Sequence, residues 1–270
     1  MRRKLPAVPY IVWMAIFVVT PIILIAVYAF TTKDGSFTLG NFQNMGTYFP
    51  VFVRSILLSL ISTVICLLLG YPISYILTKY SKRVQRALLM LIMLPMWMNY
   101  LLRTYAWMSI LENTGLLNRL LTLLNLPAVS IINTQGAVVL GMVYNYLPFM
   151  VFPIYSVMVK IDRRVIEAAQ DLGASSANIF KKVIFPLSIP GVISGITMVF
   201  VPALSTFIIS KLLGGGTSLL LGDLIEMQFL GSAYNPHLGS AISLVMMVIV
   251  MLCMYAMNKL GEGEEQAVMM

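Results

Sequence analysis

The sequence predicts an all-α membrane protein with six transmembrane helices. Of its 270 residues, 59% are hydrophobic and only 10% are charged, whereas a soluble domain is about one quarter charged. A helix needs roughly 20 apolar residues to cross a hydrocarbon core of about 30 Å. Six runs meet that length, at residues 9–30, 51–78, 87–111, 136–159, 187–210 and 238–258. We expect them to form a single transmembrane domain over residues 1–270.

The first apolar run, 9–30, is expected to be a retained helix. It follows the basic sequence MRRK, as the core of a secretory signal would, but it is longer than such a core. No small-residue cleavage site precedes the sequence KDG at 33–35. The run therefore predicts a first span that stays in the protein.

The distribution of Lys and Arg predicts the orientation of the six spans. With the N-terminus inside, thirteen of the eighteen basic residues fall in inner segments. Those thirteen are Arg2, Arg3, Lys4, Lys79, Lys82, Arg83, Arg86, Lys160, Arg163, Arg164, Lys181, Lys182 and Lys259. Because cytoplasmic loops are enriched in Lys and Arg, we expect both termini in the cytoplasm. These loops also explain the net charge of +8, so no nucleic-acid partner is expected.

Two of the expected outer connections are long enough to contain structure of their own. Residues 116–126 are leucine-rich with interspersed Asn and Arg, which predicts a short helix at the membrane interface. Residues 211–239 include LLGGGTSLLLG, whose glycines and apolar flanks fit a re-entrant, cavity-lining segment. A plain extracellular loop fits the same residues equally well, and the sequence leaves both alternatives open.

The residue patterns of enzymes and nucleotide-binding proteins are missing. Cys66 and Cys253 each lie in an apolar run without a nearby Cys or His, so neither a disulfide nor a metal site is expected. The phosphate-binding pattern G-x-x-x-x-G-K-[ST] does not occur, and the one His, His237, is expected to help start the last helix. A membrane enzyme is therefore not expected. A secondary transporter, the main rival class, should show repeated hydropathy halves or intramembrane ionisable residues, and neither stands out.

Residues 160–186 form a polar segment between the fourth and fifth runs, on the expected cytoplasmic side. Asp162 is placed to cap a helix over 163–172, and Gly173 stands where a residue with positive φ would end it. Ser175 is placed to cap a second helix over 176–185, which Pro186 is expected to close. The sequence thus predicts a helix, a glycine turn and a second helix.

The first helix of this segment carries a shallow apolar stripe. The stripe consists of Val165, Ala168, Ala169 and Leu172, which recur at helical spacing. Arg163 and Glu167 form an i, i+4 pair of opposite charge beside it. An amphipathic helix resting on lipid headgroups would show a similar pattern. The adjacent alanines and the glycine stop favour a close-fitting protein partner, because a lipid-binding face requires neither.

The same segment resembles the signature of permease subunits in bacterial ATP-binding-cassette importers. That signature is EAA, three residues, Gly, nine residues and then Ile-x-Leu-Pro. The sequence EAAQDLGASSANIFKKVIFP matches it at Glu167, Ala168, Ala169, Gly173 and Pro186, with Val183 and Phe185 at the Ile and Leu positions. The resemblance implies a permease subunit with the type I importer fold, spanning a bacterial inner membrane several times.

In this family the segment supplies a coupling helix that docks on a cytoplasmic ATPase subunit. The resemblance therefore implies an ATPase-coupling role for Glu167, Ala168, Ala169, Asp171, Leu172, Gly173 and Pro186. ATP and Mg would then bind the partner ATPase, so this chain is expected to hold no cofactor or metal and to catalyse no reaction. The implied partners are two ATPase subunits, a second permease subunit that is a copy or a related chain, an extracytoplasmic substrate-binding protein and membrane lipid.

Further segments resemble the spermidine/putrescine permeases of that family, over nearly the whole chain. They are GYPISYILTK at 70–79, LPMWMNYLLRTYAW at 94–107 and GMVYNYLPFMVFPIYS at 141–156. The resemblance implies a polyamine substrate. Another small solute, such as an oxyanion, iron or an amino-acid-like compound, is the alternative.

A path for an extended cation is expected to offer carboxylates, aromatic faces and free carbonyls. In the third run, Pro95, Asn99 and Arg103 would share one helical face. The candidate path residues are Trp97, Asn99, Arg103, Tyr105, Tyr144, Tyr146, Asp223 and Glu226. Structural roles compete for them: Arg103 can snorkel or pair with a partner's acid, the aromatic residues can anchor the interface, and the acids can be solvated. Arg103 also weighs against a cationic substrate.

Overall fold

The computed structural model describes residues 8–216, 218–231 and 233–268, with side chains as far as residue 259. The basic residues Arg2, Arg3 and Lys4, which contribute to the expected orientation, lie outside the described residues. Helices dominate the described chain, where the β structure is a single isolated bridge between Thr31 and Phe37. The fold is therefore all-α, as expected.

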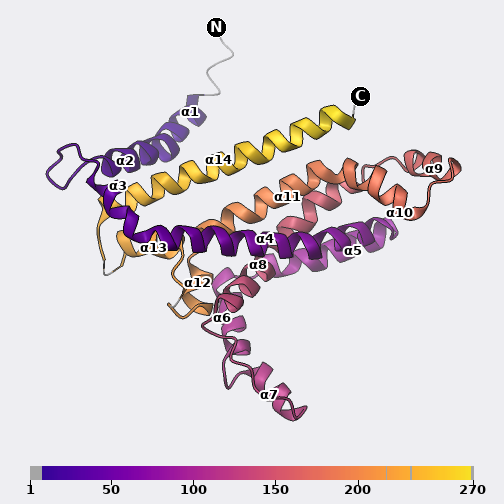
Figure 1. The fold of residues 1–270 in the computed structure, drawn as a ribbon, viewed down its shortest axis with the longest axis horizontal. Helices are drawn as coiled ribbons and strands as arrows, with labels where there is room; N and C mark the ends of the chain where they lie inside the picture. Colours follow the sequence, from indigo (N-terminus) through magenta and orange to yellow (C-terminus); the bar gives the residue numbers. More distant parts are fainter. Residues whose placement is uncertain (1–7, 217, 232, 269–270) are drawn as a thin grey trace, which may run out of the picture.

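The helices combine into long apolar rods (Figure 1). In chain order they are α1 (Val8–Met14), η2 (Ala15–Val19), α2 (Thr20–Ala29), α3 (Gly40–Asn44), η3 (Met45–Tyr48), α4 (Phe49–Thr78), α5 (Lys82–Met93), η4 (Leu94–Trp97), α6 (Tyr100–Leu111), α7 (Leu116–Leu123), α8 (Gln135–Met158), α9 (Arg163–Asp171), α10 (Ser176–Ile179), η5 (Phe180–Ile184), α11 (Phe185–Ser205), α12 (Ile208–Leu213), α13 (Leu221–Phe229) and α14 (Pro236–Val268). Among the described residues, the rods long and apolar enough to cross a membrane are Val8–Ala29, Gly40–Thr78, Gln135–Met158, Ser176–Ser205 and Pro236–Lys259. A bent pair of helices, described below, makes a sixth when its two arms are counted as one span.

The centre of the bundle is formed by α4, α8 and α11, which pack against one another. Small residues allow a close approach: a Cβ added at Gly191 of α11 would lie only 2.9 Å from the Pro153 carbonyl oxygen of α8. The Ser74 hydroxyl of α4 donates a hydrogen bond to the Val151 carbonyl of α8 at 3.0 Å. Membrane helices associate through such small residues and interhelical hydrogen bonds, because lipid provides no hydrophobic drive between them.

The last helix, α14, packs along α2, α11 and α13. His237, in its first turn, places Nδ1 3.1 Å from the Tyr28 carbonyl oxygen at the end of α2. A second apolar cluster surrounds this region and includes the buried side chains Phe52, Phe200, Leu204, Leu221 and Leu224. The outer helices α2 and α14 are thereby attached to the central three.

The third apolar run forms a broken span, so the continuous helix expected over 87–111 is wrong. Pro95 cannot donate to an α-helical ladder, and the chain passes through the 3₁₀ turn η4 into extended backbone at Met98 and Asn99. The Asn99 side chain accepts hydrogen bonds from the Leu101 and Leu102 amides, at 2.9 and 3.4 Å, and so begins a new helix. The two arms, Lys82–Trp97 and Tyr100–Leu123, meet at 90°. Pro95, Asn99 and Arg103 therefore do not share a helical face.

The fifth apolar run begins inside the polar segment, because Pro186 does not end a helix as expected. A π-helical turn, η5, joins α10 to α11, and the Phe185 amide donates to the Phe180 carbonyl five residues back. This wider turn places Pro186 in the first turn of α11, where its missing N–H is tolerated. The result is one helix over Ser176–Ser205. It ends at the extended residue Thr206, whereas the expected run continues to 210.

The connection 211–239 is folded onto the bundle and is not a plain loop. After α12, Gly215 and Gly216 adopt φ values of +56° and +74°, which reverse the chain toward α13. The side chains of Leu213, Leu220 and Leu221 are fully buried. α7 forms where the short helix was expected over 116–126, and it projects sideways from the bundle (Figure 1).

Candidate functional site

The helix α9 stands at one end of the bundle, opposite α13 (Figure 1), and is capped at both ends by its own sequence. Asp162 accepts a hydrogen bond from the Arg164 amide at 2.9 Å. At the other end, Gly173 has a φ of +77°, and its amide donates to the Gln170 carbonyl at 2.8 Å. The Ala174 amide donates to the Ala169 carbonyl at 3.0 Å. These two bonds form a complete Schellman motif, which fixes the direction in which the chain leaves α9.

One face of α9 is exposed and apolar. Val165, Ala168 and Leu172 are exposed, Leu172 to 88%, whereas Ala169 is half-buried. Arg163 Nε lies 3.1 Å from Glu167 Oε1 as expected, but both side chains are largely exposed, so the ion pair contributes only about 0.3–0.5 kcal/mol. The caps, rather than burial, define this helix.

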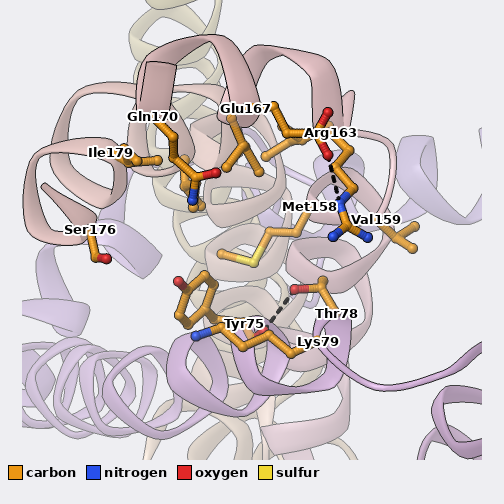
Figure 2. Close-up of a pocket in the computed structure, with 13 residues that line it drawn as sticks. Tyr75, Thr78, Lys79, Met158, Val159, Arg163, Glu167, Gln170, Ser176 and Ile179 are labelled. Atoms are coloured by element: carbon orange, nitrogen blue, oxygen red, sulfur yellow. Dashed lines mark hydrogen bonds and ion pairs between the residues drawn. The ribbon is translucent and has the colours of Figure 1, made fainter. Parts of the chain in front are cut away.

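A pocket of about 550 Å³ separates α9 from the bundle (Figure 2). Figure 2 shows Glu167 and Gln170 on its α9 side and Tyr75, Lys79 and Met158 on the facing side. The Lys79 ammonium lies over the Tyr75 ring, 4.3 Å from its centroid. α9 therefore rests on its two turns and on α10 and is not embedded in the core.

Three candidate path residues lie on the two arms of the broken span and differ in exposure. Trp97 is 78% exposed at the end of the first arm, and Tyr105 is 47% exposed on α6. Arg103 is only 8% exposed, which contradicts a snorkelling role. Its guanidinium carbon lies 5.8 Å from the centroid of the Tyr100 ring, and its Nε has no hydrogen-bond partner among the described residues. The third run thus carries a buried cation beside an aromatic ring.

The break in the third span lies beside a second break in the chain, between α11 and α12, where the fifth apolar run is interrupted. Tyr100, the first residue of α6, places its hydroxyl 3.2 Å from the Thr206 hydroxyl, just after α11 ends. Tyr146 of α8 is buried beside them and donates to the Pro202 carbonyl at 3.3 Å. Tyr144, in contrast, is half-buried and packs edge-on against Trp107 at 5.2 Å. Of the candidate aromatic residues, Tyr146 therefore lies at this junction, and Tyr144 lies outside its hydrogen bonds.

Asp223 and Glu226 lie one turn apart on α13 and have different surroundings. Asp223 is 6% exposed; Oδ2 accepts from the Leu220 amide at 2.9 Å, while Oδ1 has no partner among the described residues. Burial raises the pKa of Asp223, and the Leu220 amide and the nearby Ser210 hydroxyl, which donates its hydrogen bond to the Phe207 carbonyl, oppose that rise. Glu226 pairs with Lys211 of α12 at 3.1 Å. Neither acid is simply solvated.

Residues 5–262 match the family model described as the binding-protein-dependent transport system inner membrane component. The chain belongs to this family. It is therefore a membrane-spanning permease subunit, which overturns the secondary-transporter alternative. It is 40% identical over 262 residues to the spermidine/putrescine transport system permease protein PotB of Haemophilus influenzae, covering 92% of this chain and 91% of that protein. It is 38% identical to PotB of Escherichia coli over 248 residues, covering 88% and 90%.

Solved structures show the same fold in this permease family. A chain of a bacterial ABC transporter involved in the import of the acidic polysaccharide alginate matches with a TM-score of 0.76 and 19% identity, covering 94% of this chain and 92% of that one. A chain of the MetNI methionine ABC transporter, in an inward-facing conformation, matches with a TM-score of 0.61 and 15% identity, covering 82% and 98%. The fold is that of an ABC importer permease.

The sequence does not predict which residues meet at the junction of the two breaks. Tyr100 and Thr206 are 106 residues apart, and nothing local to either one indicates the other. Lys211 was assigned to an outer connection without a partner, although it pairs with Glu226. The signal available in the sequence was Pro95 in the third run, because interrupted spans line cavities in many transporters. Pro202 lies inside α11 and does not mark its end.

Proposed function

We propose that this permease subunit belongs to an ATP-driven importer of polyamines such as spermidine and putrescine. The structural observation that carries the coupling part is α9, a doubly capped helix that presents an apolar, alanine-containing face at one end of the bundle. The substrate class rests on 40% identity, across about nine tenths of both chains, to a spermidine/putrescine permease.

In this proposal α9 is the coupling helix. Val165, Ala168 and Leu172 dock in a groove of a cytoplasmic ATPase subunit, and Glu167 and Asp171 border that contact. ATP and Mg bind the ATPase and not this chain. Gly173 fixes the angle between α9 and the helix that begins at Ser176, so movement of the ATPase reaches the membrane through Pro186 and α11. The permease then changes between two access states whose populations depend on the nucleotide.

The proposed assembly has two permeases, two ATPases and a soluble binding protein. One α9 serves one ATPase, so two permease subunits are required, either two copies of this chain or this chain with a related one. In this proposal the α9 end lies in the cytoplasm together with both termini, because cytoplasmic segments are enriched in the basic residues found near α9. The binding protein then docks at the opposite end, near α13.

An oxyanion is the second candidate for the solute, because Arg103 is a buried cation at the junction of the broken spans. A cation held there would attract an anionic solute and repel a polyamine. The polyamine proposal requires that the Arg103 charge be compensated, for example by a carboxylate of the second permease.

The test is uptake by the complete importer in proteoliposomes supplied with ATP. We expect saturable, ATP-dependent uptake of labelled spermidine or putrescine, and no uptake of labelled sulfate. Uptake of sulfate alone would favour the oxyanion. A Glu167→Lys variant, which should still insert in the membrane, is expected to lose uptake together with the bound ATPase.

A further inference from the structure

The ion pair between Lys211 and Glu226 has an unusual geometry for a surface contact. Lys211 Nζ lies 3.1 Å from Oε1 and 3.4 Å from Oε2 of Glu226, so the ammonium group bridges both carboxylate oxygens. The Lys211 side chain is 61% exposed and that of Glu226 is 24% exposed. The carboxylate is thus set into the protein, and the ammonium reaches it from solvent.

A second carboxylate, that of Asp223, lies close to Glu226. Asp223, one turn earlier on α13, is 6% exposed as a whole residue, and its Oδ1 has no hydrogen-bond partner among the described residues. It interacts electrostatically with both Glu226 and Lys211. A buried acceptor without a partner is costly, and an additional N–H donor would satisfy it.

The ion pair between Lys211 and Glu226 lies close in the chain to the break at Thr206. Lys211 lies on α12, which directly follows the break at Thr206 and packs on α6 and α8. α13 is anchored to the start of α4 by the Leu221 amide, which donates to the Ser55 hydroxyl at 2.8 Å. The carboxylate therefore sits on a fixed helix, while its ammonium partner sits on a six-residue helix next to the break.

The lysine side chain ends in a primary alkylammonium on a four-carbon stem, which is the same chemical group as the end of a diamine. We propose that Glu226 receives a terminal ammonium of the substrate, that Asp223 supplies a second acceptor, and that Lys211 occupies this carboxylate until the substrate displaces it. The proposal rests on the polyamine function proposed above. Exchange is inexpensive because a partly exposed ion pair contributes little to stability. The carboxylate stays neutralised while no substrate is bound.

The experiment compares spermidine with monoacetylated spermidine, which lacks one terminal ammonium, as substrates of the complete importer in proteoliposomes. The measured quantity is the ratio of their uptake rates with loaded binding protein in excess. Because the binding protein is the same in every sample, its own selectivity cancels between variants. We expect Glu226→Gln to lower this ratio by about tenfold, as expected for loss of a charged hydrogen bond. Lys211→Met should leave the ratio unchanged or raise it.

The double variant Lys211→Met with Glu226→Gln separates the proposal from a purely structural ion pair. A structural pair predicts that removing both charges restores uptake, whereas the exchange model predicts that the double variant stays as defective as Glu226→Gln. Asp34→Asn is the matched control, since Asp34 is an exposed acid in the turn between α2 and α3. Thermal unfolding of each variant checks folding. A ratio unchanged by Glu226→Gln, or restored in the double variant, would overturn this inference alone. If the unmodified importer takes up neither compound, the polyamine function fails as well.

Discussion

The two ends of this permease are built in opposite ways. At the α9 end, the stabilising interactions are local in sequence. Every cap of α9 comes from residues within a few positions of the helix, and its apolar face is left exposed. At the other end, structure is non-local: the break after η4 and the break after α11 are joined by side chains 106 residues apart. The difference indicates that the shape of α9 is set by its own residues, whereas the two breaks take their shape from each other.

The largest effect should come from the local end. Replacing Gly173 by Val forces a β-branched residue into a φ of +77°, which costs about 1–2 kcal/mol per L-residue and breaks the Schellman motif. We expect uptake to fall more than tenfold and the ATPase to dissociate, with the bundle still folded. The control is Gly46→Val, because Gly46 has an ordinary φ and open space around it. Equal uptake in both variants would show that the exit angle of α9 is unimportant.

The next effect concerns the start of α6. Asn99→Ala removes the side chain that caps this helix and should cost about 0.5–2 kcal/mol of stability. Thermal unfolding in detergent measures it, with Asn178→Ala in α10 as the comparison, because Asn178 is an exposed residue inside a helix. If the two variants unfold at the same temperature, the break after Trp97 is maintained by packing and not by the cap.

A double-mutant cycle measures how strongly the two breaks depend on each other. Tyr100→Phe and Thr206→Val each remove one side of a hydrogen bond of 3.2 Å, and we expect a coupling energy of about 0.5–1.5 kcal/mol. The matched cycle uses Tyr71→Phe and Ser188→Ala, whose hydroxyls are 2.9 Å apart within the packed bundle. A coupling near zero at Tyr100 and Thr206, with a measurable one at Tyr71 and Ser188, would separate the two breaks energetically.

The smallest effect is expected for the ion pair on α9. Arg163→Gln should change stability by less than about 0.5 kcal/mol, because both partners are largely exposed. Uptake should also be retained if shape and not this charge directs docking. Leu172→Ser is the contrasting variant: it should be equally stable, since Leu172 is 88% exposed, but should bind the ATPase less well. If Arg163→Gln loses uptake and Leu172→Ser does not, charge and not shape directs the docking of α9 on the ATPase.

The sequence was a good guide wherever the signal is local. Asp162, Gly173 and Ser175 each cap a helix where their chemistry predicts it. Hydrophobic length locates the first, fourth and last spans within two residues, whereas the helices of the second and fifth spans begin at Gly40 and Ser176, well before the expected starts. Predictions from the sequence are wrong at two prolines. Pro186 is compatible with a continuous helix once a π turn precedes it, and Pro95 breaks a span that hydropathy alone joins. Whether a proline ends, kinks or passes through a helix depends on neighbouring helices, and a single sequence does not contain that information.

The helix from Ser176 to Ser205 has 30 residues, so it is a rod of about 45 Å. One tip stands beside the turn after α9, and the other stops at Thr206, within hydrogen-bonding distance of Tyr100. Rotating such a rod by about 10° around its midpoint carries each tip through about 4 Å. That distance exceeds the reach of the hydrogen bond at Thr206. A small tilt of this helix at the α9 end would therefore be enough to break the hydrogen bond between Thr206 and Tyr100 at its other end.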